Sequence, residues 1–119
     1  MKKILIIDDN EDIRNFLTVA LQSYYPDLEI LEAEDGQDGL QKATEWRPDL
    51  IFVDGQMPKL SGDIVSQQIR SNPDLQRTRI VGFTAAPTHS VLTENMSHFC
   101  DVLLAKTSPL AQIIQACTA

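Results

Sequence analysis

Short apolar runs, each ending at a side chain that can bind a ligand, constrain the fold of this chain most strongly. They are residues 4–7, 50–53, 80–83 and 102–105, and they lead directly into Asp8 and Asp9, Asp54, Thr84 and Lys106. Continuous apolar runs of this length predict parallel strands that are buried on both faces by helices. In an open parallel sheet, ligands bind beyond the carboxyl ends of the strands. We therefore expect these polar side chains to meet in one crevice.

Between the runs, apolar residues recur at the 3.6-residue spacing of amphipathic helices. Asn10 can cap the first helix and Pro26 ends it. Residues 28–33 form a more polar run, which suits a strand at the edge of the sheet. The predicted apolar residues of the first three helices are Ile13, Phe16, Leu17, Ala20, Leu21 and Tyr24, then Leu40, Ala43 and Trp46, then Ile64, Val65 and Ile69.

The fourth predicted helix starts at Pro87 and is rich in Thr, Ser, His and Asn, so its helix propensity is low. We expect it to be the least stable helix and the one that moves most readily. Ser108 is predicted to cap the fifth helix, with Pro109 as its first residue. The predicted apolar residues of these two helices are Val91, Leu92 and Met96, then Leu110, Ile113, Ile114 and Cys117.

Five strand–helix units in 119 residues predict an α/β fold, an open doubly wound sheet of five parallel strands with helices on both faces. We expect one domain over residues 1–119, because no linker, repeat or low-complexity segment interrupts the pattern. Met1 stands immediately before the first strand, which favours a natural start of the protein.

Composition narrows the class of function. A net charge of −7 argues against direct binding to nucleic acid, which needs Lys and Arg against the phosphates. Cys100 and Cys117 have no metal-ligand spacing and are predicted to be free thiols on packed elements. No stretch approaches the roughly 20 apolar residues of a membrane span, and the opening apolar run is too short for a signal peptide. We expect a cytoplasmic protein that does not bind membranes.

The motifs at the strand ends resemble those of the receiver domain of two-component response regulators. Asp8 and Asp9 look like the acidic pair of that family, and residues 54–62 resemble its D-x-x-M-P-x-x-x-G stretch. Thr84 and Lys106 match its hydroxyl and lysine positions. The resemblance covers essentially the whole chain. It implies a flavodoxin-like sheet with the strand order 2-1-3-4-5.

The residues themselves indicate a metal site, because three converging carboxylates repel one another by about 1 kcal/mol per pair in water and about 4 at a dielectric near 20. A hard divalent cation removes that repulsion. The resemblance implies Mg²⁺ bound by Asp9, Asp54 and the backbone carbonyl of Gln56, with Asp8 holding a metal-bound water. It also implies that Asp54 accepts a phosphoryl group, while Lys106 and Thr84 stabilise the transferred group.

The implied partners are a sensor histidine kinase or a phosphotransfer domain as phosphodonor, and a downstream effector protein or output domain as target. The domain would then change its interaction surface on phosphorylation. It would not be a conventional enzyme, since it would catalyse only its own phosphotransfer and slow autodephosphorylation. Gln56 and Ala86 stand at positions that resemble rate-tuning sites, and neither can activate water as a base.

Two positions depart from the family pattern. Leu103 stands where the family has an aromatic residue, so the aromatic part of the usual switch is missing. We expect switching to run through Thr84 and the fourth helix. Lys106 precedes Thr107 where the family has a cis proline, and we predict a trans bond because a cis bond before a non-proline residue costs about 2.5–4 kcal/mol.

Three other functions remain open at this point. A haloacid-dehalogenase-type phosphatase would need a second Asp where Gln56 stands, and a flavin carrier would need a hydroxyl- and glycine-rich loop in place of the acidic residues after the first strand. The third alternative is a degenerate receiver that acts mainly as a phosphorylation-independent interaction module, since Leu103 and the loop at Thr107 are atypical.

Overall fold

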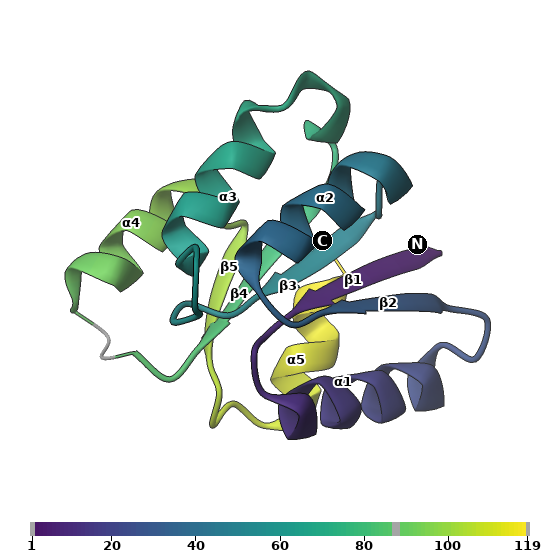
Figure 1. Cartoon of the computed structure of the whole chain (residues 1–119). Coiled ribbons are helices and arrows are strands. Elements are labelled where there is room, and N and C mark those ends of the chain that lie inside the picture. The colour runs from purple at the N-terminus through teal and green to yellow at the C-terminus, as the bar shows by residue number, and fades with distance from the viewer. Residues whose placement is uncertain (1, 87–88, 119) are drawn as a thin grey trace.

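Residues 2–86 and 89–118 are described by a computed structural model of the protein (Figure 1). Across these residues, five parallel strands form one sheet in the order β2-β1-β3-β4-β5. The strands are β1 (Lys3–Ile7), β2 (Glu29–Ala33), β3 (Leu50–Val53), β4 (Arg79–Thr84) and β5 (Val102–Ala105). The predicted fold class and strand order are confirmed, and the polar strand β2 lies at an edge as expected.

Helices cover both faces of the sheet (Figure 1). α1 (Glu11–Tyr24) and α5 (Leu110–Cys117) lie on one face, and α2 (Gly36–Trp46), α3 (Gly62–Ser71) and α4 (Val91–Phe99) lie on the other. A short 3₁₀ helix, η1 (Pro73–Leu75), follows α3. The predicted start of the fourth helix at Pro87 falls outside the described residues, and α4 is capped by Ser90. No helix in the described part of the chain is long and apolar enough to cross a membrane.

The inner strand β1 contributes to two core layers because its side chains alternate between the faces of the sheet. Ile4 and Ile6 pack in the layer that holds Leu17 of α1 and Ile113 of α5. Leu5 and Ile7 pack in the layer formed with α2, α3 and α4. All four of these β1 side chains are fully buried. Both cysteines are free, as predicted.

Four residues predicted to lie on apolar helix faces are exposed. Phe16, Tyr24, Ile64 and Val91 have exposed fractions of 47%, 56%, 37% and 73%. The prediction was wrong for these residues because each helix meets the sheet along a narrow stripe, and side chains at the margin of the stripe point into solvent. In α1 that stripe consists of Leu17, Ala20 and Leu21.

The predicted N-cap of α1 is confirmed, whereas the predicted N-cap of α5 is not. Asn10 caps α1, since its side-chain oxygen accepts hydrogen bonds from the N–H groups of Asp12 at 2.9 Å and Ile13 at 3.2 Å. The prediction for α5 was wrong by one residue: Pro109 is the N-cap, because its ψ of 152° is extended and not helical. The Lys106–Thr107 bond is trans, as predicted.

Replacing Gly62 with Ala should destabilise the protein by about 3 kcal/mol through overpacking. A Cβ atom at this position would overlap the carbonyl oxygen of Asp54 and lie 2.8 Å from the Cα of Gly55. The start of α3 cannot easily retreat, because the Gly62 N–H donates to the Gly55 carbonyl at 2.8 Å. Urea unfolding of the variant measures the loss, with Gln67→Ala on the exposed face of α3 as control. Equal midpoints for Gly62→Ala and wild type would contradict this packing.

Candidate functional site

The acidic residues meet because β1 and β3 are neighbours in the sheet. Ile7 at the end of β1 pairs with Val53 at the end of β3. Asp8 and Asp54, which come directly after these residues, therefore lie side by side at the same edge of the sheet. The Asp54 N–H donates to the Ile7 carbonyl at 2.9 Å, which extends the ladder of hydrogen bonds one residue past both strands. The Asp8 N–H likewise donates to the Ala33 carbonyl of β2 at 3.0 Å. The backbone of Asp8 and Asp54 is therefore an extension of the sheet.

Three carboxylates converge at this edge. Asp8, Asp9 and Asp54 each offer an oxygen, and the three oxygens lie within 4.8 Å of one another. Asp8 and Asp54 are nearly buried, with exposed fractions of 2% and 4%, whereas Asp9 is exposed. The Asp8 side chain is fixed by the Asn10 N–H, which donates to its Oδ1 at 2.9 Å. This set of hard oxygen donors with one open side fits a divalent cation such as Mg²⁺.

Lys106 supplies positive charge to the same crevice from the end of β5. Its Nζ lies 3.0 Å from Asp8 Oδ2 and 3.2 Å from Asp54 Oδ1. Its N–H donates to the Thr84 carbonyl at 3.0 Å, which holds the residue at the sheet edge. Burial lowers the pKa of Lys106, but the hydrogen bond to Asp8 and the two carboxylate charges outweigh it and raise the pKa above its usual value. Lys106 is therefore an ammonium ion between two acids.

Thr84 closes the crevice on the side of β4. Its hydroxyl lies against the backbone of Gly55, where a Cβ atom would come within 2.5 Å of Thr84 Oγ1. That oxygen accepts a hydrogen bond from the Ala86 N–H at 3.0 Å, so the hydroxyl proton can be donated elsewhere. Thr84 also lines a hollow of about 150 Å³ together with Leu103, Ala86 and Thr93. Leu103, where the family pattern has an aromatic ring, thus borders open space beside this hydroxyl.

The surroundings of Asp54 shift the pKa of its carboxyl group. Burial raises its pKa, the charge of Asp8 raises it further, and Lys106 only partly offsets both, so that the pKa is about 7. The carboxylate of Asp9 adds to the upward shift. Near neutral pH the crevice therefore carries more negative charge than Lys106 can compensate. A bound cation would remove this repulsion and favour the ionised carboxylate of Asp54.

This shift predicts a pH dependence of stability. An ordinary Asp titrates at 3.8, whereas folded Asp54 holds its proton to about 7, so the folded state binds more protons between these values. Without metal, the free energy of unfolding should therefore fall as pH rises from about 4 to about 7, by on the order of 1–3 kcal/mol. In Asp54→Asn, the free energy of unfolding should lack the part of this fall that is due to Asp54. Urea unfolding in EDTA across this pH range checks it, and parallel curves for the two proteins would contradict it.

Some side chains around the crevice were not predicted. Arg14 on α1 donates from Nη1 to the Asp8 carbonyl at 2.7 Å. Lys59 has a left-handed φ of 71° and pairs with Asp35 at 3.2 Å, which joins the loop after β3 to the start of α2. Neither residue carries a sequence signal, since an arginine in a helix and a lysine in a loop usually face solvent. Gln56 is exposed, and the role of its carbonyl as a ligand stays a prediction.

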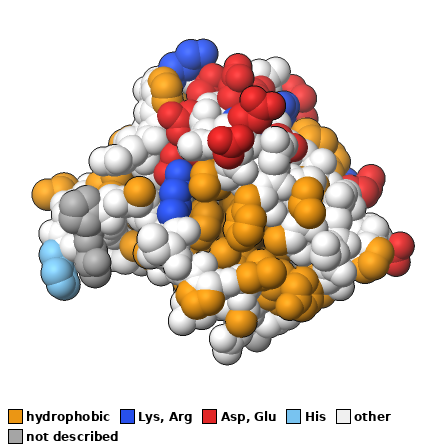
Figure 2. All heavy atoms as spheres, turned by 90° about the horizontal axis from the view of Figure 1, so that it is seen from below, with side chains coloured by type: hydrophobic (Ala, Val, Ile, Leu, Met, Phe, Trp, Pro, Cys, Tyr) orange, Lys and Arg blue, Asp and Glu red, His pale blue; other side chains and the backbone are white. Residues whose placement is uncertain are grey.

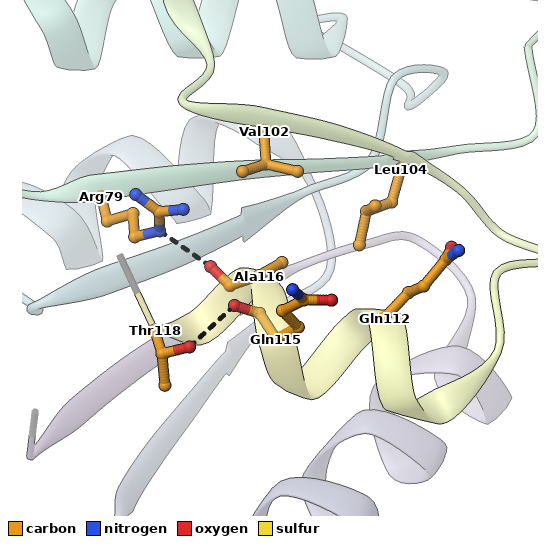
Figure 3. Close-up of a pocket in the computed structure, with 7 residues that line it drawn as sticks. All are labelled: Arg79, Val102, Leu104, Gln112, Gln115, Ala116 and Thr118. Atoms are coloured by element: carbon orange, nitrogen blue, oxygen red, sulfur yellow. Dashed lines mark hydrogen bonds between the residues drawn. The ribbon is translucent and has the colours of Figure 1, made fainter.

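Other surface features do not fit the same chemistry. A hollow of about 490 Å³ lies between β5 and α5, lined by Arg79, Val102, Leu104, Gln112, Gln115, Ala116 and Thr118 (Figure 3). The guanidinium of Arg79 donates from Nε to the Ala116 carbonyl at 2.8 Å, and no acid among the described residues lines this hollow. Figure 2 shows Asp and Glu side chains gathered at one border of the face seen from below, with hydrophobic side chains in its middle.

Comparisons with known proteins agree with this geometry. The chain is 27% identical to the response regulator GacA of Pseudomonas syringae over 98% of its own length and 53% of that protein. It is 34% identical to hybrid signal transduction histidine kinase D of Dictyostelium discoideum, over 69% of the chain and 5% of the kinase. The chain thus spans about half of one relative and a small part of the other.

Solved structures show the same fold. The chemotaxis protein CheY4 of Vibrio cholerae superimposes with a TM-score of 0.85 at 26% identity, over 98% of this chain and 96% of that one. The receiver domain of sensor histidine kinase PA1611 of Pseudomonas aeruginosa, described with a magnesium ion in its active site cleft, gives 0.85 at 24% identity over 96% and 92%. Residues 4–118 match the family model described as "Response regulator receiver domain". The chain therefore belongs to the family of response regulator receiver domains.

Proposed function

We propose that this domain accepts a phosphoryl group on Asp54 from a phosphohistidine of a sensor histidine kinase or a phosphotransfer domain. The observation that carries the proposal is the position of Asp54, which is nearly buried between Asp8 and Lys106 at the carboxyl edge of the sheet. Such a carboxylate is desolvated and held in one orientation, as a nucleophile should be.

The donor set supports Mg²⁺ as the cofactor. Asp9 and Asp54 would bind the ion directly together with the Gln56 carbonyl, and Asp8 would hold a water in its shell. When bound, the ion supplies positive charge against the transferring phosphoryl group. The three carboxylate oxygens lie within 4.8 Å of one another, which is close enough for them to share one ion.

The chain's own residues then have distinct roles. An oxygen of Asp54 forms a bond to phosphorus as the bond from phosphorus to the histidine nitrogen breaks, and the electron pair stays on that nitrogen, which takes a proton from solvent. Lys106, now held at 3.2 Å from Asp54, would place its ammonium against the developing negative charge. The Thr84 hydroxyl, which has its proton available, would donate to a phosphoryl oxygen.

Phosphorylation would pass to the surface through Thr84 and α4. Thr84 and Thr93 of α4 line the same hollow, so a movement of the hydroxyl toward a phosphoryl oxygen changes a surface that α4 shares. We propose that the altered face binds an effector protein or output domain, and that the domain slowly dephosphorylates itself. The extent of the domain over residues 1–119 and the cytoplasmic location stay predictions.

Labelling with radioactive acetyl phosphate tests the proposal. We expect one Mg²⁺-dependent label per chain that EDTA prevents and hydroxylamine removes, as for an acyl phosphate. A chain that binds Mg²⁺ yet takes no label would instead be a phosphorylation-independent interaction module. Leu103 favours this second function, because it stands where the family pattern has the aromatic residue that responds to phosphorylation.

A further inference from the structure

Arg14 reaches from α1 to the backbone of the acidic pair. Its Nη1 donates to the carbonyl oxygen of Asp8 at 2.7 Å, and its own N–H donates to the carbonyl of Asn10 at 3.2 Å. The first of these bonds fixes the peptide plane between Asp8 and Asp9. Asp9 is exposed and lies beyond the last rung of the sheet, so the orientation of this plane helps to set where its carboxylate points.

The guanidinium of Arg14 is itself held in place. Its Nε donates to Glu32 Oε1 on the edge strand β2 at 3.0 Å, and the side chain is only 14% exposed. A planar guanidinium that bonds through two separate nitrogens has its orientation fixed, which an ammonium could not reproduce. Glu32, Arg14 and the Asp8 carbonyl therefore form a continuous connection from β2 to the acidic crevice.

Charge alone gives no reason for an arginine at this place to strengthen metal binding. A positive charge next to the carboxylates would repel a divalent cation and weaken its binding. We propose that Arg14 is a positioning residue for the metal site, oriented by Glu32, and that it fixes the Asp8–Asp9 peptide so that Asp9 faces the cation. This inference rests on the proposed function, since it concerns the same Mg²⁺ site.

The substitution Arg14→Gln separates positioning from charge, because the two effects have opposite signs. Loss of positioning should weaken Mg²⁺ binding by about tenfold, as is usual for residues that orient metal ligands. Loss of a nearby positive charge would instead strengthen binding. Isothermal titration of the metal-free protein with MgCl₂ measures the dissociation constant. Arg77→Gln removes the same charge from an exposed site before β4, at the other end of the sheet, and is the matched control.

A double substitution tests the role of Glu32. Glu32→Gln should weaken Mg²⁺ binding severalfold, and Arg14→Gln with Glu32→Gln should be no weaker than Arg14→Gln alone, because Glu32 acts through Arg14. If both groups acted only by charge, their effects would be opposite and would cancel in the double variant. Cancellation would overturn the inference.

Hydrogen exchange measured in EDTA distinguishes a loss of local positioning in Arg14→Gln from a loss of the whole fold. The Asn10 N–H, which donates to Asp8 Oδ1, should exchange faster in Arg14→Gln, while core amides of β3 exchange as in wild type. If Arg14→Gln does not fold, Arg14→Lys takes its place, and weaker Mg²⁺ binding is again expected. Binding as tight as wild type or tighter overturns the inference. Failure of the wild type to bind Mg²⁺ would overturn the proposed function itself.

Discussion

Replacing Asp54 with Asn will reduce phosphoryl labelling from acetyl phosphate to background, by more than about 100-fold. The amide has nearly the shape of the carboxylate but lacks the nucleophilic oxygen, so the covalent step cannot occur. The fold should survive, because Asp8 still pairs with Lys106 at 3.0 Å. Autoradiography of the two proteins after equal exposure to donor and Mg²⁺ measures the difference.

The matched control is Asp27→Asn, which makes the same chemical change at an exposed position between α1 and β2. It should take label at the wild-type rate. Label that survives in Asp54→Asn and is still released by hydroxylamine would place the acyl phosphate on another carboxylate. That result would contradict the assignment of Asp54 as the phosphoacceptor.

Lys106→Met should slow labelling by about 10²- to 10³-fold at saturating Mg²⁺, the usual loss when one preorganised group against a developing charge is removed. Methionine keeps the length and apolar stem of lysine, so packing changes little. The ammonium lies within 3.2 Å of both Asp8 and Asp54, and its removal also leaves two nearly buried acids without a cation. We therefore expect lower stability in EDTA that Mg²⁺ largely restores.

Time courses of labelling give the rate, and circular dichroism confirms that the variant is folded. Lys2→Met is the control, because this exposed lysine precedes β1 at the opposite end of the sheet. A rate for Lys106→Met close to that of the control would show that the ammonium takes no part in phosphotransfer. Its contacts with Asp8 and Asp54 would then serve stability alone.

The sequence predicted the sheet and the meeting of its acidic ends because both follow from local pattern. Continuous apolar runs identify buried strands, and parallel neighbours must end at one edge. Asp8, Asp54 and Lys106 could be brought together by this reasoning without coordinates. It could not predict that Lys106 contacts Asp8 as closely as Asp54, because that depends on side-chain rotamers and on the path of the loop after β5.

Other features could be found only from the three-dimensional structure, because they depend on how the helices pack on the sheet. The burial of Leu17 and the exposure of Phe16 depend on how α1 lies on the sheet, and periodicity gives the apolar stripe but not its width. Arg14 lies on the same helix and resembles a solvated residue in sequence, yet it reaches the Asp8 carbonyl because the chain bends at Asp9 between β1 and α1. The raised pKa of Asp54 likewise follows from burial and from the distance to neighbouring charges.

The central claim is that Asp9 and Asp54 bind one cation together. Crystals grown with Mn²⁺ in place of Mg²⁺, measured at the manganese absorption edge, test it most directly, because anomalous scattering locates the ion independently of the protein atoms. We predict one strong peak per chain, with a carboxylate oxygen of Asp9 and one of Asp54 both within bonding distance, about 2.0–2.3 Å. A peak bound to only one of these residues, or a peak elsewhere on the surface, would contradict the account.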